Sequence, residues 1–147
     1  MTRLRGERGA TVAEAAFVVP MLFMSLLAFL DYSLWVMQSN QASAVARDGA
    51  RTGIVSYRQA DVPGSGDYNN IDATITRRLG GQHNYTLTII CMQPATPSQV
   101  SCNSNPASGT NRIQVTVTWT RRALSPFTAS FGKTQTVTGT AVMQVIS

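Results

Sequence analysis

Residues 15–30 read AAFVVPMLFMSLLAFL, sixteen residues without a charge in a chain of 147. Residues 10–13 and 32–37 extend this run to more than 25 mostly apolar residues, interrupted only by Glu14 and Asp31. A bilayer core requires about 20 residues of helix, so the segment is long enough to span a membrane. Pro20 is compatible with this reading, because a membrane helix can satisfy the carbonyl that a proline frees.

The helical pattern continues beyond the apolar run. Residues 31–56 contain no proline, and their first glycine is Gly49. A helical spacing of i, i+3, i+4 and i+7 is followed by Leu30, Leu34, Met37, Gln41, Ala44 and Asp48, and the several alanines favour helix. We therefore predict one helix over residues 10–56, about 70 Å long at 1.5 Å per residue. Its second half is expected to project from the membrane and serve as a spine.

The remaining residues, 57–147, predict a small strand-rich domain. After a Pro-Gly loop at residues 63–66, Asn70 is expected to cap a short helix over residues 71–79, which Gly80 and Gly81 end. Three segments, residues 85–91, 111–120 and 134–146, alternate apolar side chains with polar ones, mostly threonine. This alternation is typical of a sheet that is wet on one side. The fold class is therefore α+β, a long helix packed on a three-stranded antiparallel sheet with one short helix.

Charge is scarce and unevenly placed. Only 13% of residues are charged, and the formal net charge is +5. Such a composition suits exported proteins and subunits packed into assemblies. Arg3, Arg5 and Arg8 precede the apolar run, which predicts a cytoplasmic N-terminus and an exported C-terminal part. The other basic residues are scattered, with no basic helix or aromatic platform, so nucleic-acid binding is not expected.

Two cysteines, Cys91 and Cys102, flank a loop rich in Pro, Ser and Asn. We predict that they form a disulfide, which implies an oxidising compartment. Two free thiols in a cytosolic protein are the alternative. Together with the single histidine, His83, they are too few to hold a structural metal.

No residues point to catalysis, a cofactor or a small-molecule substrate. His83 lies in a polar turn, and we interpret it as a surface residue. Asp67, Asn69 and Asp72 could chelate calcium, but the surrounding DYNNID lacks the glycine and glutamate of a calcium loop, and helix capping explains them better. Asn84 begins a glycosylation sequon, a pattern that is common by chance. We expect a protein that is not an enzyme and holds no metal.

The junction before the apolar run carries the functional signal. Gly9 is followed five residues later by Glu14, behind a short basic leader. This arrangement resembles the processing site of type IV pilin-like proteins, and it implies cleavage between Gly9 and Ala10 by a prepilin peptidase. A small residue lets the backbone approach catalytic groups closely. A carboxylate in a membrane segment is costly unless it is paired, and in pilin-class assemblies the freed amine of a neighbouring subunit is the expected partner of Glu14.

Residues 5–23, RGERGATVAEAAFVVPMLF, and residues 45–51, VARDGAR, resemble the TadE-like family of tight-adherence pilus pseudopilins. The resemblance implies packing of the long helix through Arg47, Asp48, Gly49 and Arg51. It also implies partners: the membrane, a prepilin peptidase, other pilin or pseudopilin subunits and the pilus assembly platform. Ala15 stands where major pilins of this system commonly have an aromatic residue, which favours a minor subunit. The expected role is assembly of a pilus for adhesion or secretion.

The layout predicts three parts: a cytoplasmic leader at residues 1–9, a transmembrane and projecting helix at 10–56, and an extracytoplasmic domain at 57–147. The expected location is the bacterial cell membrane, with a single crossing. Two alternatives remain open. The first 30 residues could be a secretory signal peptide, with small residues at 43–46 as the cleavage site. The chain could also be a single-pass anchor for a small binding domain unrelated to pili.

Overall fold

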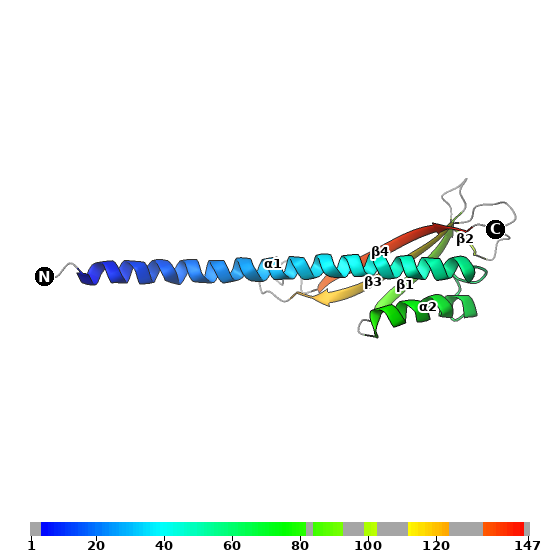
Figure 1. Cartoon of the computed structure of the whole chain (residues 1–147), viewed down its shortest axis with the longest axis horizontal. Coiled ribbons are helices and arrows are strands. Elements are labelled where there is room, and N and C mark those ends of the chain that lie inside the picture. The colour runs from blue at the N-terminus through cyan, green and yellow to red at the C-terminus, as the bar shows by residue number, and fades with distance from the viewer. Residues whose placement is uncertain (1–3, 82–83, 93–98, 103–111, 124–133, 146–147) are drawn as a thin grey trace. The chain divides into compact units, whose positions relative to one another are not determined.

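The computed structural model describes residues 4–81, 84–92, 99–102, 112–123 and 134–145. They form two helices and four strands in the order α1 (Leu4–Val55), α2 (Gly66–Leu79), β1 (Tyr85–Met92), β2 (Gln99–Val100), β3 (Arg112–Arg122) and β4 (Thr134–Gln144) (Figure 1). The α+β fold class predicted from the sequence is confirmed. The chain divides into two compact units, Met1–Trp35 with Arg122–Gln135, and Val36–Arg121 with Thr136–Ser147. We call them the first and the second unit.

Helix α1 is continuous over 52 residues and passes through Pro20. It begins at Leu4, earlier than expected from the sequence, so that the segment predicted as a leader is helical from that residue on. Arginine, glutamate and leucine are good helix formers, and nothing between Leu4 and Ala10 breaks a helix as a proline would. The C-terminal end lies within one residue of the predicted one.

Helix α2 also begins earlier than predicted, at Gly66, and the assignment of Asn70 as its cap was wrong. Ser65 is the N-cap, and its Oγ accepts a hydrogen bond from the backbone N–H of Tyr68 at 3.1 Å. Residues 67–70, Asp-Tyr-Asn-Asn, form the first turn of the helix, a position that tolerates Asp and Asn well. Gly80 ends the helix in the left-handed conformation, with φ of 63°, as expected.

The sheet has the strand order β2-β1-β3-β4. β1 and β3 are antiparallel, with Leu87 opposite Val117 and Ile89 opposite Val115. The three long strands were predicted, and their buried residues alternate with exposed ones as expected. The two-residue strand β2, which pairs with the end of β1, was not predicted. Two residues are too few for an alternation to be visible in a sequence.

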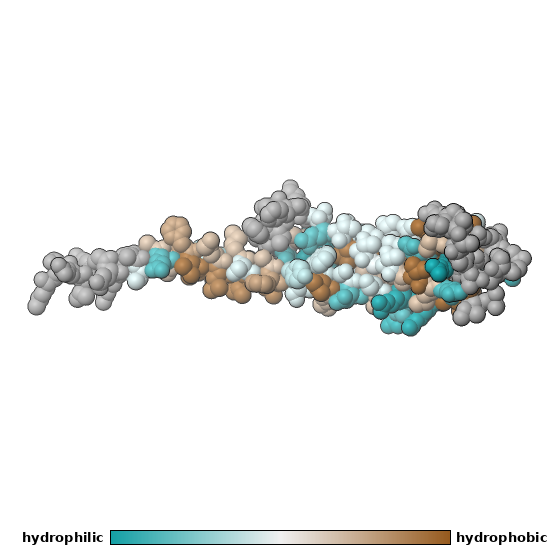
Figure 2. Space-filling view, turned by 90° about the horizontal axis from the view of Figure 1, so that it is seen from above, coloured by the Kyte–Doolittle hydropathy of each residue, from teal (hydrophilic) through white to brown (hydrophobic). Residues whose placement is uncertain are grey.

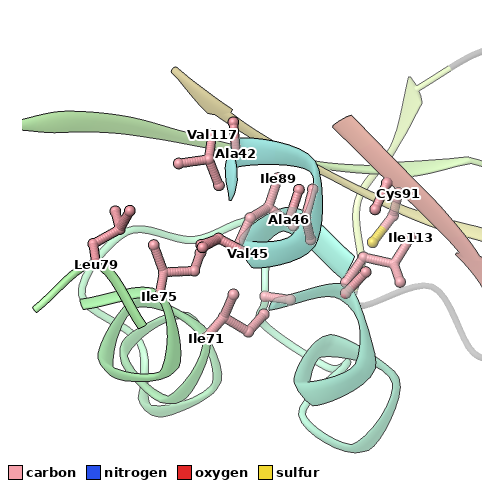
Figure 3. Packing of buried hydrophobic residues seen from close by; sticks show 14 of the residues in the cluster. Ala42, Val45, Ala46, Ile71, Ile75, Leu79, Ile89, Cys91, Ile113 and Val117 are labelled. Carbon is pink, nitrogen blue, oxygen red and sulfur yellow. The ribbon is translucent and has the colours of Figure 1, made fainter. Parts of the chain in front are cut away.

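The core of the second unit lies where the C-terminal part of α1 meets α2 and the sheet. Figure 3 shows Ala42, Val45 and Ala46 of α1 facing Ile71, Ile75 and Leu79 of α2, with side chains of β1 and β3 alongside. All six helix residues are at most 4% exposed. The apolar face of the sheet is thus covered by the same helix that carries the apolar N-terminal run.

Tyr85 links β1 to α2. Its hydroxyl donates to Asp72 Oδ1 at 2.6 Å and lies 2.7 Å from Thr76 Oγ1. Burial, and next the hydrogen bond to Asp72, raises the pKa of Tyr85 to about 12. The unfolded phenol loses its proton near pH 10, while the folded one keeps it up to about pH 12. The free energy of unfolding therefore falls as pH rises through this interval.

We expect Tyr85→Phe to lower the free energy of unfolding at pH 7 by about 1 kcal/mol, because the hydrogen bond is lost. It should also reduce the fall in stability between pH 10 and 12. Thermal unfolding of wild type and variant at pH 8 and pH 11, followed by circular dichroism, measures both effects. An equal drop in melting temperature for the two proteins would contradict the assignment.

Candidate functional site

The junction predicted from the sequence lies on α1. Gly9 and Ala10 are helical in backbone, and the side chain of Glu14 is exposed. Within the described residues Glu14 makes no hydrogen bond or ion pair. Its carboxylate is therefore available to a partner outside the chain.

Around and after Glu14 the surface of α1 is apolar. Phe17, Met21 and Phe29 are between 73% and 78% exposed, and none of residues 11–27 is buried. Figure 2 shows the hydrophobic residues gathered along the N-terminal half of this helix. Among the described residues, α1 is the single helix that is both long enough and apolar enough to cross a membrane. A helix in the core of a soluble protein would bury such side chains, whereas these are exposed.

In the part of the chain that the structure describes, two charged side chains without a predicted role are buried. Asp31 is 1% exposed, while its neighbours Leu30 and Tyr32 are 59% and 64% exposed. Arg121 is 9% exposed and stands on the inward side of β3. The sequence signal for Asp31 was its place within an apolar run. A carboxylate there is costly unless it has a polar partner. For Arg121 the signal was its place in the period-two pattern of β3.

The second half of α1 carries a stripe of small residues that faces the core: Ala42, Val45, Ala46, Gly49, Ala50 and Gly53. A Cβ atom added at Gly49 would lie 3.1 Å from Ile75 Cδ1 and 3.3 Å from Val115 Cγ1. α2 and β3 therefore both approach the helix backbone at this glycine. A larger side chain would force these elements apart.

The charged residues of the VARDGAR segment lie next to this stripe. Asp48 Oδ2 accepts from Arg78 Nε of α2 at 2.9 Å, and Asp48 Oδ1 lies 3.9 Å from Arg51 Nη1. Arg47 is exposed. Gly49 thus lets α2 come close, and the adjacent Asp48 bonds to it. The segment joins α1 to α2 through one close packing contact and one ion pair.

We expect Asp48→Asn to lower the free energy of unfolding by about 1 kcal/mol, because the Asp48 side chain is only 25% exposed and its pair with Arg78 is short. Arg51→Gln is the matched control. Its longer contact and 74% exposed side chain predict a change within about 0.5 kcal/mol. Chemical denaturation of the full chain in detergent measures both. Equal losses of unfolding free energy for the two variants would contradict a stabilising ion pair between Asp48 and Arg78.

An open groove of about 480 Å³ lies between the end of α1 and α2. Its walls carry Arg51 and Arg77, and Thr52 and Thr74 approach each other at 3.4 Å across it. No carboxylate, histidine or cysteine lines it. The groove therefore offers guanidinium, amide and hydroxyl hydrogen-bond donors.

The calcium candidates are engaged within the fold. Asp67 Oδ2 accepts from the Gln59 N–H at 3.2 Å, and Asp72 accepts from Tyr85. Asn69 Nδ2 donates to the carbonyl of Gly64 at 3.3 Å. In the described ranges no three His, Cys, Asp or Glu side chains gather as a metal site would require. His83 lies outside the described residues.

Cys91 and Cys102 form a disulfide, and both are 1% exposed. Cys102 follows β2, and its backbone N–H donates to Asp61 Oδ2 at 3.2 Å. The bond holds the short strand β2 against β1 near the edge of the sheet. Asp61 was not singled out by the sequence, because its partner lies 41 residues away.

The match to a known protein family lies within helix α1. Residues 9–51 match the model of the TadE-like protein family, which confirms the resemblance over this segment. No curated protein and no solved structure matches the chain. The matched segment contains the Gly9 junction, Glu14, the apolar run and the VARDGAR segment.

Proposed function

From the match of residues 9–51 to the TadE-like model, we propose that this chain is a minor pilin-class subunit, a pseudopilin, that helps to assemble a tight-adherence pilus for adhesion or secretion. The match supports an association with such a pilus, and the subunit role is our inference. The observation that carries it is the two-part character of α1. Its first half is exposed and apolar, whereas its second half packs into the core of the second unit.

Anchoring in the bacterial membrane follows from the first half. With Arg3, Arg5 and Arg8 before it, the helix would cross once, with the N-terminus in the cytoplasm and residues 57–147 outside. The disulfide between Cys91 and Cys102 suits that exported position. The partners proposed are a prepilin peptidase, other pilin-class subunits and the assembly platform.

Processing is proposed between Gly9 and Ala10, so that Ala10 supplies a new amino group. Glu14, exposed and without a partner among the described residues, would then pair with the Ala10 amine of a neighbouring subunit. A carboxylate held among apolar helices is costly unless it meets an opposite charge. The pair would therefore set the register between adjacent helices during assembly.

The packing of the second unit argues against the signal-peptide alternative. Cleavage within residues 43–46 would cut through the buried stripe of α1, where Val45 and Ala46 are 4% and 0% exposed. It would also remove Ala42, which lies against β4. Cleavage after Gly9 leaves every one of these contacts intact. This supports the pilin-class reading over a secreted domain.

We expect N-terminal sequencing of the membrane-extracted protein to begin at Ala10. Gly9→Leu should block cleavage, because the larger side chain crowds the scissile bond. Glu14→Gln should leave cleavage intact and reduce incorporation into the pilus, with a loss of about 3 kcal/mol at each subunit contact. The measurements are N-terminal sequencing and the amount of the protein in sheared pili, in cells that lack the native copy.

Gly6→Leu and Ala16→Gln are the matched controls. The first makes the same change within the leader, away from the scissile bond. The second adds an amide to the same helix without removing the carboxylate. Normal piliation with Glu14→Gln would refute the pairing role, and a mature N-terminus near Arg47 would favour the secreted domain.

A further inference from the structure

Threonine is the commonest residue on the open face of the sheet, and it fills the middle of that face. The register of β1 on β3 places Thr86 beside Thr118 and Thr88 beside Thr116. On the other side of β3, Thr116 Oγ1 lies 3.3 Å from Thr140 Oγ1, and Thr118 Oγ1 lies 3.4 Å from Thr138 Oγ1. Two rows of three hydroxyls therefore cross the sheet. We call these six residues the threonine face.

The threonine face is open and uncharged. Its four residues on β1 and β4 are exposed, and its two on the central strand β3 are half-buried. β1 and β4 contain no charged residue, and on β3 the outward arginines, Arg112 and Arg122, stand only at the two ends. Protein surfaces normally carry charges on about a quarter to a third of their residues. A face of this size without any is unusual for a surface that stays in water.

Two copies of the threonine face are chemically complementary. Each threonine hydroxyl both donates and accepts a hydrogen bond, so two such faces can satisfy each other. A charged partner would lose hydration here without meeting an opposite charge. Elsewhere the net charge of +5 makes two copies repel. Within residues 57–147 the face is therefore a place where copies of this chain can meet without like-charge repulsion.

We propose that two copies of this chain pair sheet to sheet through the threonine face. Facing sheets pack about 10 Å apart, and three strands about 4.8 Å apart give a face roughly 14 Å wide. Val142, 51% exposed, and Ile90 add apolar area at one end. The buried area would be on the order of 1,000 Å² in total, the low end for a specific interface.

Pairing of this size is weak between free domains and is strengthened when a membrane holds the copies together. The inference deepens the proposed assembly role and rests on it only in that subunits share one membrane. Purified protein tests the pairing without a pilus, so a failure of pairing and a failure of the pilin role are distinguishable.

The test uses the full chain in detergent micelles, with dimerisation followed by sedimentation over a range of protein concentrations. We expect a reversible wild-type dimer. Thr116→Lys and Thr116→Glu, at the centre of the face, should each raise its dissociation constant about tenfold or more through like-charge contact. An equal mixture of the two variants should restore dimerisation, because opposite charges then meet across the interface. Val55→Lys, at a position that is 88% exposed on α1, should leave the constant unchanged.

Circular dichroism establishes that each variant keeps its fold. Thr140→Lys on the edge strand β4 serves if Thr116→Lys lowers the melting temperature. A wild-type chain that stays monomeric overturns the proposal. A dimer whose dissociation constant is unchanged by Thr116→Lys also overturns it, because the apolar half of α1 would then be the contact. A mixture of folded variants that remains monomeric overturns face-to-face pairing as well.

Discussion

Gly139→Ala is expected to lower the free energy of unfolding by about 3 kcal/mol or more, a large share of the roughly 5–15 kcal/mol of a small domain. Gly139 lies on the buried side of β4, directly against α1. A Cβ atom there would overlap the carbonyl group of Ala42 and lie 2.6 Å from Ser43 N. These are backbone atoms of a helix, so they cannot turn aside as a side chain can. The strand and the helix would have to separate.

Chemical denaturation of the full chain in detergent, followed by far-ultraviolet circular dichroism, measures this loss. Gly66→Ala is the matched control, because a Cβ at that first residue of α2 meets nothing within 4 Å. Its effect should stay within about 0.5 kcal/mol. Gly49→Ala should fall between the two, since its nearest contact is the flexible end of Ile75 at 3.1 Å. Equal stability of the Gly139 and Gly66 variants would refute the close approach.

Replacing Cys91 and Cys102 with serine is expected to destabilise the protein by about 3 kcal/mol. The bond joins residues 11 apart in sequence, and closing a loop of this size restricts the unfolded chain by about that amount. For a domain of about 100 residues, 3 kcal/mol corresponds to a fall of about 12–24 °C in melting temperature. Differential scanning calorimetry measures it.

Reduction supplies the control. A reductant should lower the melting temperature of wild type toward that of the double variant and leave the variant unchanged. Wild-type midpoints that do not respond to reductant would contradict a stabilising role. Two free thiols in protein extracted from the envelope without reductant would also remove one support for export.

Much of this protein could be predicted from local patterns. The apolar run, the helical spacing of residues 31–56 and the alternation of the three long strands each require only neighbouring residues to be recognised. The junction of Gly9, Ala10 and Glu14 is likewise a local pattern, although its role stays a proposal. The start of α2 was misplaced because Asp and Asn are common both in loops and in the first turn of a helix.

The sequence by itself therefore determined the elements and the two-part character of α1, because periodicity and hydropathy are properties of consecutive residues. Only the tertiary structure decided which residues meet. It brought Gly139 against Ala42, Arg78 against Asp48 and Asp61 against Cys102, pairs that lie between 30 and 97 residues apart. It also buried Asp31 and aligned three strands into a threonine face. Such contacts depend on how distant elements pack, and no local pattern records that distance.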